Sequence, residues 1–255
     1  MQILTNREGS VLRLQINRPE KRNALTIGMY EQLTSALQHA DRDAKVRVVL
    51  IHGCEDSFSS GNDLQDFAHS PPTGEDSPVG RFITGISRAR KPLVAAVAGP
   101  AVGIGTTMLL HCDFVYAAEN TRFQLPFVNL ALPPEAGSSL LLPMQVGHLR
   151  AAELLMLGEP FSAAKALQYG LVTEVSADGP AALKAAQAAA AKLSAKPPAA
   201  LHLIKALMKK PQVKQLAAQV GDETRNFVEQ LRSPEVAEAL QAFSEKRAPD
   251  FTQFA

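Results

Sequence analysis

The chain has 255 residues, which suits one sizeable domain or a core with an appendage, and its composition is that of an ordinary globular protein. Its 26 basic and 25 acidic residues leave a formal charge of +1, so no overall field recruits nucleic acid or an anionic membrane. No apolar run reaches about 18 residues, which excludes a transmembrane helix.

The two ends and the cysteines indicate the compartment. The first residues alternate like strands, without the basic and then apolar plan of a signal peptide. The last residues, "FTQFA", are not a peroxisomal address. Cys54 and Cys112 stand far apart in apolar contexts with no C-x-x-C pair, which indicates reduced, buried thiols. We therefore expect a cytoplasmic protein.

Strand and helix patterns alternate over roughly the first 175 residues. In chain order, the patterns first predict a hairpin over 3–17 turning at Glu8-Gly9 and a helix from about Thr26 to Asp43 with Thr26 as N-cap. A buried strand over 46–53, a turn over 57–63 that opens a short helix, a loop over 70–78 and a helix over 79–89 follow. The next predicted elements are a strand over 92–99, a glycine turn over 100–105 that opens a helix over 106–112, and strands over 113–119 and 121–127.

From Gly137 the helical patterns dominate, interrupted by one predicted strand over 171–176. Helices are expected over 138–147, 148–158, 162–170 and 180–195, and after "AKPP" only helices follow. The pattern predicts an α/β fold, divided into a core over residues 1–196 and a C-terminal helical region over residues 197–255.

Two glycine turns stand between a strand and a helix. "AVAGPAVGIGTTML" has the spacing G-x3-G-x-G, which is neither the dinucleotide fingerprint nor a P-loop, and "SFSSGNDL" repeats the same plan. Such a turn needs glycine for its dihedral angles whatever its function, and Asn62 or Asp63 would cap the helix that follows. Alternatively, each turn aims one main-chain N–H at a shared point and forms half of an oxyanion hole.

Glu135 stands on a stiff corner in "NLALPPEAGSSLLLP". An acid in such a corner is most often solvated or caps a helix. The six histidines show no ligand spacing, and His111 reads as a satisfied core histidine. Ser138 and Ser139 lack the G-x-S-x-G elbow of a hydrolase. The residues alone therefore indicate no more than two turns that are able to stabilise an anion.

Several segments together resemble the enoyl-CoA hydratase/isomerase (crotonase) superfamily. They are "NRPEKRNAL", "FSSGNDL", "KPLVAAVAGPAVGIGTTMLLHCDFVYAAENTRFQLPF", "SAAKALQYGLVTEV" and "FVEQLRSPEVAEALQAFSEKRAPDF". The resemblance covers nearly the whole chain. It implies a spiral of ββα turns with a C-terminal helical region used in trimerisation, acyl-CoA thioester substrates, no cofactor besides the coenzyme A of the substrate, and a homotrimer or dimer of trimers.

The resemblance also implies roles for individual residues. The N–H groups of Asn62 and Ile104 match the two oxyanion donors. The coenzyme A and acyl site maps to Arg22, Ala24, Ser60, Gly61, Asp63, Leu64 and Gly103, with Thr107, Phe127 and Leu132 as pocket wall and Lys246 near the nucleotide phosphate of this or a neighbouring subunit.

The acids decide between the branches of the superfamily. Hydratases resemble one another in carrying a glutamate at the positions of Thr107 and Phe127, and neither residue can activate water or protonate carbon. Glu135 instead matches the acid of the Δ3,Δ2-enoyl-CoA isomerases, most closely the peroxisomal-type branch. We therefore expect an isomerase of fatty acid β-oxidation with Glu135 as its one base. Another crotonase reaction on a different acyl-CoA, and a non-catalytic acyl-CoA-binding scaffold, remain the alternatives.

Overall fold

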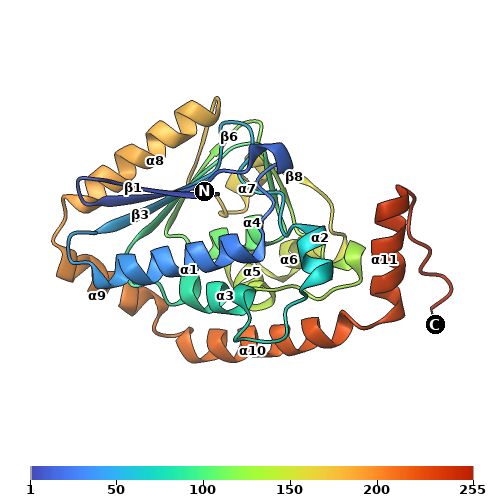
Figure 1. Cartoon of the computed structure of the whole chain (residues 1–255). Helices are drawn as coiled ribbons and strands as arrows, with labels where there is room; N and C mark the ends of the chain where they lie inside the picture. The colour runs from blue at the N-terminus through green and yellow to red at the C-terminus, as the bar shows by residue number, and fades with distance from the viewer. Residues whose placement is uncertain (1, 255) are drawn as a thin grey trace.

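The computed structural model describes residues 2–254, which form two sheets surrounded by helices (Figure 1). The strands are β1 (Ile3–Glu8), β2 (Val11–Ile16), β3 (Val48–His52), β4 (Leu93–Val97), β5 (Pro100–Val102), β6 (Phe114–Ala118), β7 (Arg122–Gln124), β8 (Phe161–Ser162) and β9 (Glu174–Ser176). The larger sheet has the order β1-β2-β3-β4-β6-β9 and is parallel apart from the β1–β2 hairpin. The smaller sheet has the order β5-β7-β8.

Helices make up the rest of the regular structure. The α-helices are α1 (Ile27–Arg42), α2 (Leu64–His69), α3 (Pro78–Ser87), α4 (Ile104–Thr107), α5 (Ser138–Val146), α6 (His148–Met156), α7 (Ala163–Gln168), α8 (Gly179–Ser194), α9 (Pro198–Lys209), α10 (Val213–Gln230) and α11 (Pro234–Glu245). Three short 3-10 helices are η1 (Pro19–Lys21), η2 (Met108–His111) and η3 (Val128–Leu130).

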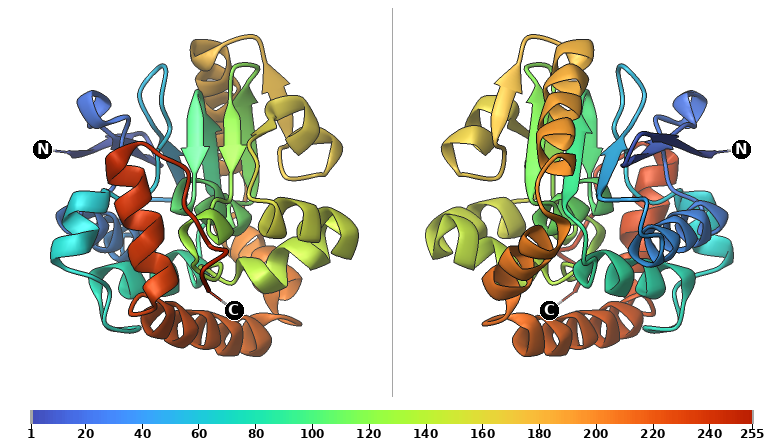
Figure 2. Two further views of the ribbon diagram at one scale, coloured as in Figure 1. Left: turned by 90° about the vertical axis from the view of Figure 1, so that its right-hand side faces the viewer. Right: turned by 90° about the vertical axis from the view of Figure 1, so that its left-hand side faces the viewer.

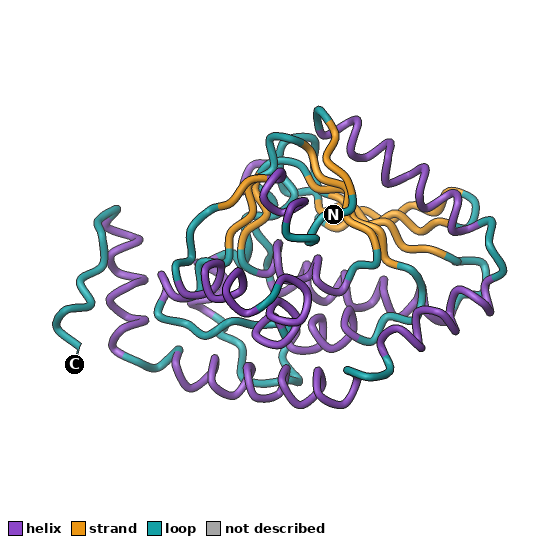
Figure 3. The backbone as a smooth tube through the Cα atoms, turned by 180° about the vertical axis from the view of Figure 1, so that it is seen from behind, coloured by secondary structure: helices purple, strands orange, loops and turns teal. Residues whose placement is uncertain are grey.

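The larger sheet is covered on both faces, as Figures 2 and 3 show from three sides. Helix α8 packs on one face, where Ala186 and Ala190 meet apolar side chains of β3 and β4. Helices α1 and α3 lie on the other side, over the main core. Because β3 and β4 are buried along their whole length, they read as continuous apolar runs rather than alternating ones.

The chain alternates between the two sheets as it winds. Strand β4 of the larger sheet continues into β5 of the smaller one, and β6 continues into β7 in the same way. This arrangement gives the α/β spiral that the sequence predicts, and it stacks the turns that follow β3 and β4 on one another. The stacking creates the site described below.

Most predicted elements are present, and where the structure differs from the prediction the cause is local. Thr26 caps α1 by accepting a hydrogen bond from the N–H of Met29, and Asp63 rather than Asn62 caps α2. The helix predicted over 106–112 is divided between α4 and η2, and residues 100–102 before it form β5. The strands predicted over 121–127 and 171–176 are shorter, because only 122–124 and 174–176 pair with a neighbour.

The C-terminal helices extend around the core. Helix α10 runs beneath α3 and α5, and α11 stands at the side of the molecule (Figure 1). The predicted division between residues 196 and 197 falls between α8 and α9, and it stays a prediction. Cys54 and Cys112 are free thiols, half-buried rather than buried as predicted. Within residues 2–254, no helix is both long and apolar enough to cross a bilayer.

Candidate active site

A cavity of about 680 Å³ lies between the two glycine turns, the segment that carries Glu135 and helix α11. Most residues that the sequence predicts for the site line it, namely Ala24, Ser60, Gly61, Asn62, Asp63, Leu64, Gly103, Ile104, Phe127, Leu132 and Glu135. In the part of the chain that the structure describes, Arg22, Thr107 and Lys246 lie outside this lining. Segments far apart in the sequence therefore meet at one cavity.

The two glycine turns pack directly against each other. The N–H of Ser59 donates to the carbonyl of Pro100 at 3.0 Å, and the N–H of Val102 donates to the carbonyl of Ser59 at 2.9 Å. A Cβ atom on Gly61 would lie 3.0 Å from the Val102 carbonyl oxygen, and one on Gly105 would lie 2.7 Å from the Ser59 carbonyl oxygen. Glycine is therefore required at both positions to let the two turns approach.

Two main-chain N–H groups at this contact are available to a ligand. They belong to Asn62 in the first turn and Ile104 in the second, and within residues 2–254 neither donates to a main-chain carbonyl. Gly103 precedes Ile104 with φ 55° and ψ −120°, a conformation that glycine adopts with little strain. Two unpaired donors on the wall of one cavity are what an oxyanion hole requires.

Residues 18–25 brace the first turn from outside. The N–H of Leu25 donates to the carbonyl of Gly61 at 2.8 Å, and the N–H of Asp63 donates to the carbonyl of Leu25 at 2.9 Å. The Arg18 guanidinium forms an ion pair of 2.7 Å with the Asp63 carboxylate, which also caps α2. The position of the Asn62 N–H is therefore determined from both sides along the chain.

Glu135 occupies a tight corner between η3 and α5. The two residues after it, Ala136 and Gly137, have φ values of 62° and 72°, so the main chain turns sharply away. Glu135 is only 6% exposed, and within residues 2–254 its Oε1 atom has no hydrogen-bond partner. Burial, and secondly the charge of Glu223, raise the pKa of Glu135 to about 8. Such a carboxyl group can accept and return a proton near neutral pH.

Comparison with known proteins identifies the family. A family model described as enoyl-CoA hydratase/isomerase matches residues 6–254. The chain belongs to the enoyl-CoA hydratase/isomerase family. The solved structure of OdaA from Pseudomonas aeruginosa is 48% identical, with a TM-score of 0.93 over 95% of this chain and 98% of that one. The fold is therefore the crotonase fold that the sequence predicts.

The curated relatives of this family member carry both isomerase and hydratase names. Enoyl-CoA delta isomerase 2 of Rattus norvegicus is 35% identical over 248 residues, which are 94% of this chain and 63% of that protein. The 2,3-dehydroadipyl-CoA hydratase of Escherichia coli K12 is 33% identical over 253 residues, 98% of each chain. This chain thus spans less than two thirds of the rat relative. These names leave isomerase and hydratase chemistry open.

Two acids line the cavity of this family member, and only one is unpaired. Asp63 is held by Arg18, whereas Glu135 takes part in none of the ion pairs between residues 2–254. Thr107 and Phe127, which stand where hydratases are expected to carry acids, are buried, and Phe127 forms part of the cavity wall. Among residues 2–254, Glu135 is therefore the acid of the cavity lining that forms no ion pair.

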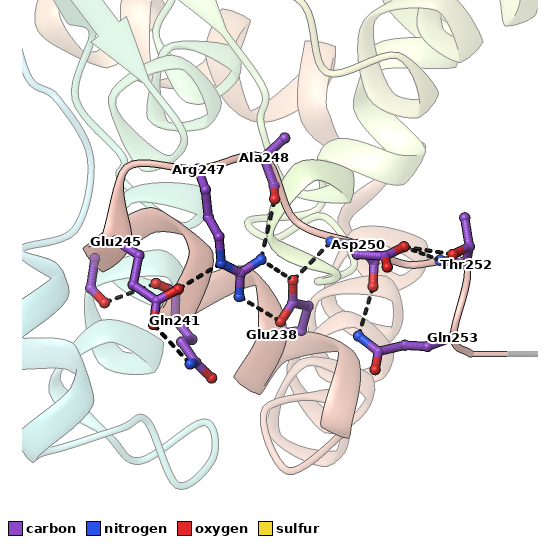
Figure 4. A network of polar contacts seen from close by, with 9 residues as sticks. Glu238, Gln241, Glu245, Arg247, Ala248, Asp250, Thr252 and Gln253 are labelled. Carbon is purple, nitrogen blue, oxygen red and sulfur yellow. Dashed lines mark hydrogen bonds and ion pairs between the residues drawn. The ribbon is translucent and has the colours of Figure 1, made fainter.

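The basic residues on the cavity lining are sequence neighbours of those predicted for the coenzyme A site. Lys21 and Arg247 line it, whereas the predicted Arg22 and Lys246 stand one position away and are exposed. Arg247 is already neutralised, since Glu238 accepts from both of its terminal nitrogens at 2.5 and 2.9 Å and Glu245 accepts from Nε at 2.6 Å (Figure 4). The hydrogen bonds from Arg247 lower the pKa of Glu238 to about 2. The phosphate contact proposed for Lys246 stays a prediction.

The sequence motifs did not identify two residues that lie beside the site. The Tyr30 hydroxyl, from the buried face of α1, donates to the Oδ1 atom of Asn62. Glu223, on α10, contacts the turn after Glu135. Glu223 could have been found from the sequence, because it shares a buried helix face with Val220 and Phe227, where an acid is rare. Tyr30 carries no such signal.

Proposed function

We propose that this chain is a Δ3,Δ2-enoyl-CoA isomerase, which moves the double bond of a 3-enoyl-CoA into conjugation with the thioester. The observation that carries the proposal is Glu135, the one carboxyl on the cavity lining that is unpaired among residues 2–254, in a cavity that also holds the N–H groups of Asn62 and Ile104. The reaction needs one base, one anion site and no change of oxidation state, so it requires no cofactor beyond the coenzyme A of the substrate.

The first step is proton removal from C2 of the substrate. The Glu135 carboxylate takes the C2 proton, and the electron pair of that C–H bond moves onto the thioester oxygen through C1, giving a dienolate. In the second step the protonated Glu135 returns the same proton to C4. The electrons of the dienolate then form the C2–C3 double bond, and the thioester carbonyl is restored. One carboxyl group serves both steps because C2 and C4 can share one face of the planar dienolate.

The anion formed between the two steps requires hydrogen-bond donors. The N–H groups of Asn62 and Ile104 would donate to the thioester oxygen as its negative charge develops. In acyl-transfer enzymes each such donor contributes about 10²- to 10³-fold in rate. Both donors belong to main chain held by the contact between the glycine turns, so they need no reorganisation when the charge forms.

The lining of the cavity favours isomerisation over hydration. Adding water across a double bond needs one group to activate the water and another to protonate carbon. Phe127 and Leu132 beside Glu135 are apolar and supply neither group. An apolar wall at these positions would also limit the access of water that could compete for the dienolate.

The raised pKa of Glu135 predicts the pH dependence. With a pKa of about 8, about one tenth of the free enzyme carries the ionised base at pH 7. We expect kcat/KM to rise with pH and to level off above about 8. The trimer or dimer of trimers that the resemblance implies stays a prediction.

The test is an assay of purified protein with 3-decenoyl-CoA, in which the conjugated 2-enoyl product is followed by its absorbance. Glu135→Gln removes the base at constant volume, and Glu159→Gln, an exposed acid, is the matched control. We expect product from the wild type and the control, and a loss of about 10³-fold or more in Glu135→Gln.

Two other results would redirect the proposal. A 3-hydroxyacyl-CoA made from a 2-enoyl-CoA at a comparable rate would show hydratase chemistry. Binding of coenzyme A thioesters without turnover of the 3-enoyl-CoA would favour another acyl substrate or a non-catalytic scaffold. The first result would overturn the assignment to isomerisation alone, and the second would overturn the isomerase assignment.

A further inference from the structure

The N-terminus of α5 lacks a cap from its own residues. Its N-cap residue is Gly137, which has no side chain, and the first N–H groups of a helix need acceptors from elsewhere. Glu135 stands two residues before this N-cap. A carboxylate is stabilised at a helix N-terminus, so Glu135 is the acid that the sequence places nearest to these N–H groups.

Another acid occupies that position. Glu223 reaches from α10 and accepts from the N–H of Gly137 at 2.5 Å and from the N–H and the hydroxyl of Ser139, the N–H at 2.9 Å. One turn earlier on α10, the side-chain amide of Gln219 donates to the Ser139 hydroxyl at 2.9 Å. Glu223 is only 5% exposed, and both of its carboxylate oxygens are used.

The main chain of Glu135 is held independently of its side chain. Its carbonyl accepts from the N–H and the hydroxyl of Ser138, at 3.1 and 2.6 Å. The next carbonyl, that of Ala136, accepts from Nε2 of His111 at 2.8 Å. The corner is thus fixed while the Glu135 carboxyl group keeps one oxygen without a partner in the described part of the chain and lines the cavity.

We propose that Glu223 is a positioning residue that caps α5 in place of Glu135 and so keeps the Glu135 carboxyl group unpaired and facing the cavity. The reading of Glu135 as a base rests on the isomerase function proposed above. The capping itself rests only on the contacts of Glu223. Without Glu223, the N–H groups of Gly137 and Ser139 would be free to bind the Glu135 carboxylate and draw it away from the substrate.

Capping of α5 by Glu223 in place of Glu135 also affects the ionisation of Glu135. The charge of Glu223 disfavours ionisation of Glu135, and the N–H groups that would favour it are withheld. The other titratable groups at this corner are Tyr30 on α1, whose pKa is raised by burial and by Glu135, and His111 on η2, whose pKa burial lowers to about 4. Replacing Glu223 by a neutral residue should therefore lower the pKa of Glu135.

The test measures the ionisation of Glu135 directly, so it does not depend on turnover. Protein labelled with ¹³C at the glutamate carboxyl groups is titrated by NMR, and Glu135→Gln identifies the Glu135 signal by its loss. In Glu223→Gln we expect the pKa of Glu135 to fall by about one unit or more. Isomerisation should lose about tenfold or more in kcat, with KM changed less than about twofold.

Three further variants complete the design. Asp222→Asn alters the neighbouring, exposed acid of α10 and should leave both the pKa and kcat unchanged. Glu223→Asp keeps the charge and should recover part of the loss. If Glu223→Gln fails to fold, Ser139→Ala removes one hydrogen bond to Glu223 and should shift the Glu135 signal in the same direction by a smaller amount.

The outcomes separate this inference from the proposed function. An unchanged Glu135 pKa in Glu223→Gln overturns the inference, whether kcat is retained or is lost together with stability. A lowered pKa together with a wild type that isomerises no 3-enoyl-CoA would support the capping exchange and overturn the isomerase proposal. A lowered pKa with lowered kcat supports both.

Discussion

The hydroxyl of Tyr30 donates a hydrogen bond to the side-chain oxygen of Asn62, the residue whose main-chain N–H is the first proposed oxyanion donor. Tyr30 is 1% exposed and its ring packs at 5.4 Å from that of Phe82, so the hydroxyl is rigidly placed. Helix α1 is thereby connected to the glycine turn after β3. The contact suggests that α1 helps to position the N–H of Asn62.

Tyr30→Phe should weaken this positioning without emptying the core. Loss of one hydrogen bond is worth about 0.5–1.5 kcal/mol, so we expect kcat to fall roughly two- to tenfold with little change in KM. Steady-state kinetics with 3-decenoyl-CoA checks this. Thr34→Val, which removes a buried hydroxyl of the same helix that bonds only within α1, is the control. Equal losses in both variants would assign the effect to general loosening of α1.

Glu135→Gln should be more stable than the wild type at high pH. The pKa of Glu135 is raised from an ordinary 4.5 to about 8. Between these two pH values the folded protein therefore keeps a proton on Glu135 that the unfolded chain has released. The free energy of unfolding of the wild type is therefore unaffected by ionisation of this residue below about pH 4.5, and it decreases as the pH rises from there to about 8. Glutamine does not titrate, so the variant keeps what the wild type loses, up to roughly 5 kcal/mol.

Urea unfolding at about pH 5 and about pH 9 measures this difference. We expect the gain of Glu135→Gln over the wild type to be small at the lower pH and large at the higher one. Glu159→Gln, at an exposed position, should show no such trend. A gain that is the same at both pH values would mean that Glu135 ionises in the folded protein like an ordinary surface acid.

Lys21 should contribute more than Arg247 to binding of the anionic coenzyme A. Lys21 lines the cavity and is absent from the ion pairs of residues 2–254, whereas Arg247 is neutralised by Glu238 and Glu245. We expect Lys21→Ala to raise KM roughly two- to fivefold at low ionic strength, and less at high salt. Lys192→Ala, at an exposed position of α8, is the control. A larger effect of Arg247→Gln than of Lys21→Ala would reverse this order.

Phe67 and Phe227 should limit the length of the acyl chain. Their rings meet edge to face with centroids 6.0 Å apart, and both residues line the main cavity and a second cavity of about 30 Å³. Glu135 also lines both cavities, so a chain extending beyond C4 meets this aromatic pair. We expect Phe67→Leu to favour longer substrates, by about fourfold for each additional buried methylene.

The ratio of kcat/KM for 3-decenoyl-CoA to that for 3-hexenoyl-CoA measures this preference. Phe243→Leu is the matched control, because Phe243 also lines the main cavity but is 63% exposed. We expect the ratio to increase in Phe67→Leu and to stay constant in the control. An unchanged ratio in Phe67→Leu would show that the acyl chain leaves by another route.

The sequence by itself determined most of the elements and the positions of the sharp main-chain turns at the site. The glycines of the two turns and the Pro-Pro-Glu-Ala-Gly corner specify their dihedral angles through neighbours in the chain, and the continuous apolar runs of β3 and β4 identify buried strands. The likeness of these segments to a known family extended this reading to the whole fold. Such features depend on residues that are close in the sequence, so they can be predicted without knowledge of the tertiary structure.

The tertiary structure alone decided the state of each side chain. Lys21 and Arg247 line the cavity, whereas their neighbours Arg22 and Lys246, predicted for the coenzyme A site, have left-handed conformations and lie outside this lining. A lone acid before a helix is ordinarily its cap, and Glu135 is not, because Glu223 from a helix more than eighty positions away occupies that place. Ionisation depends on burial and on neighbouring charges, and these come from residues that are distant in the sequence and adjacent only in the fold.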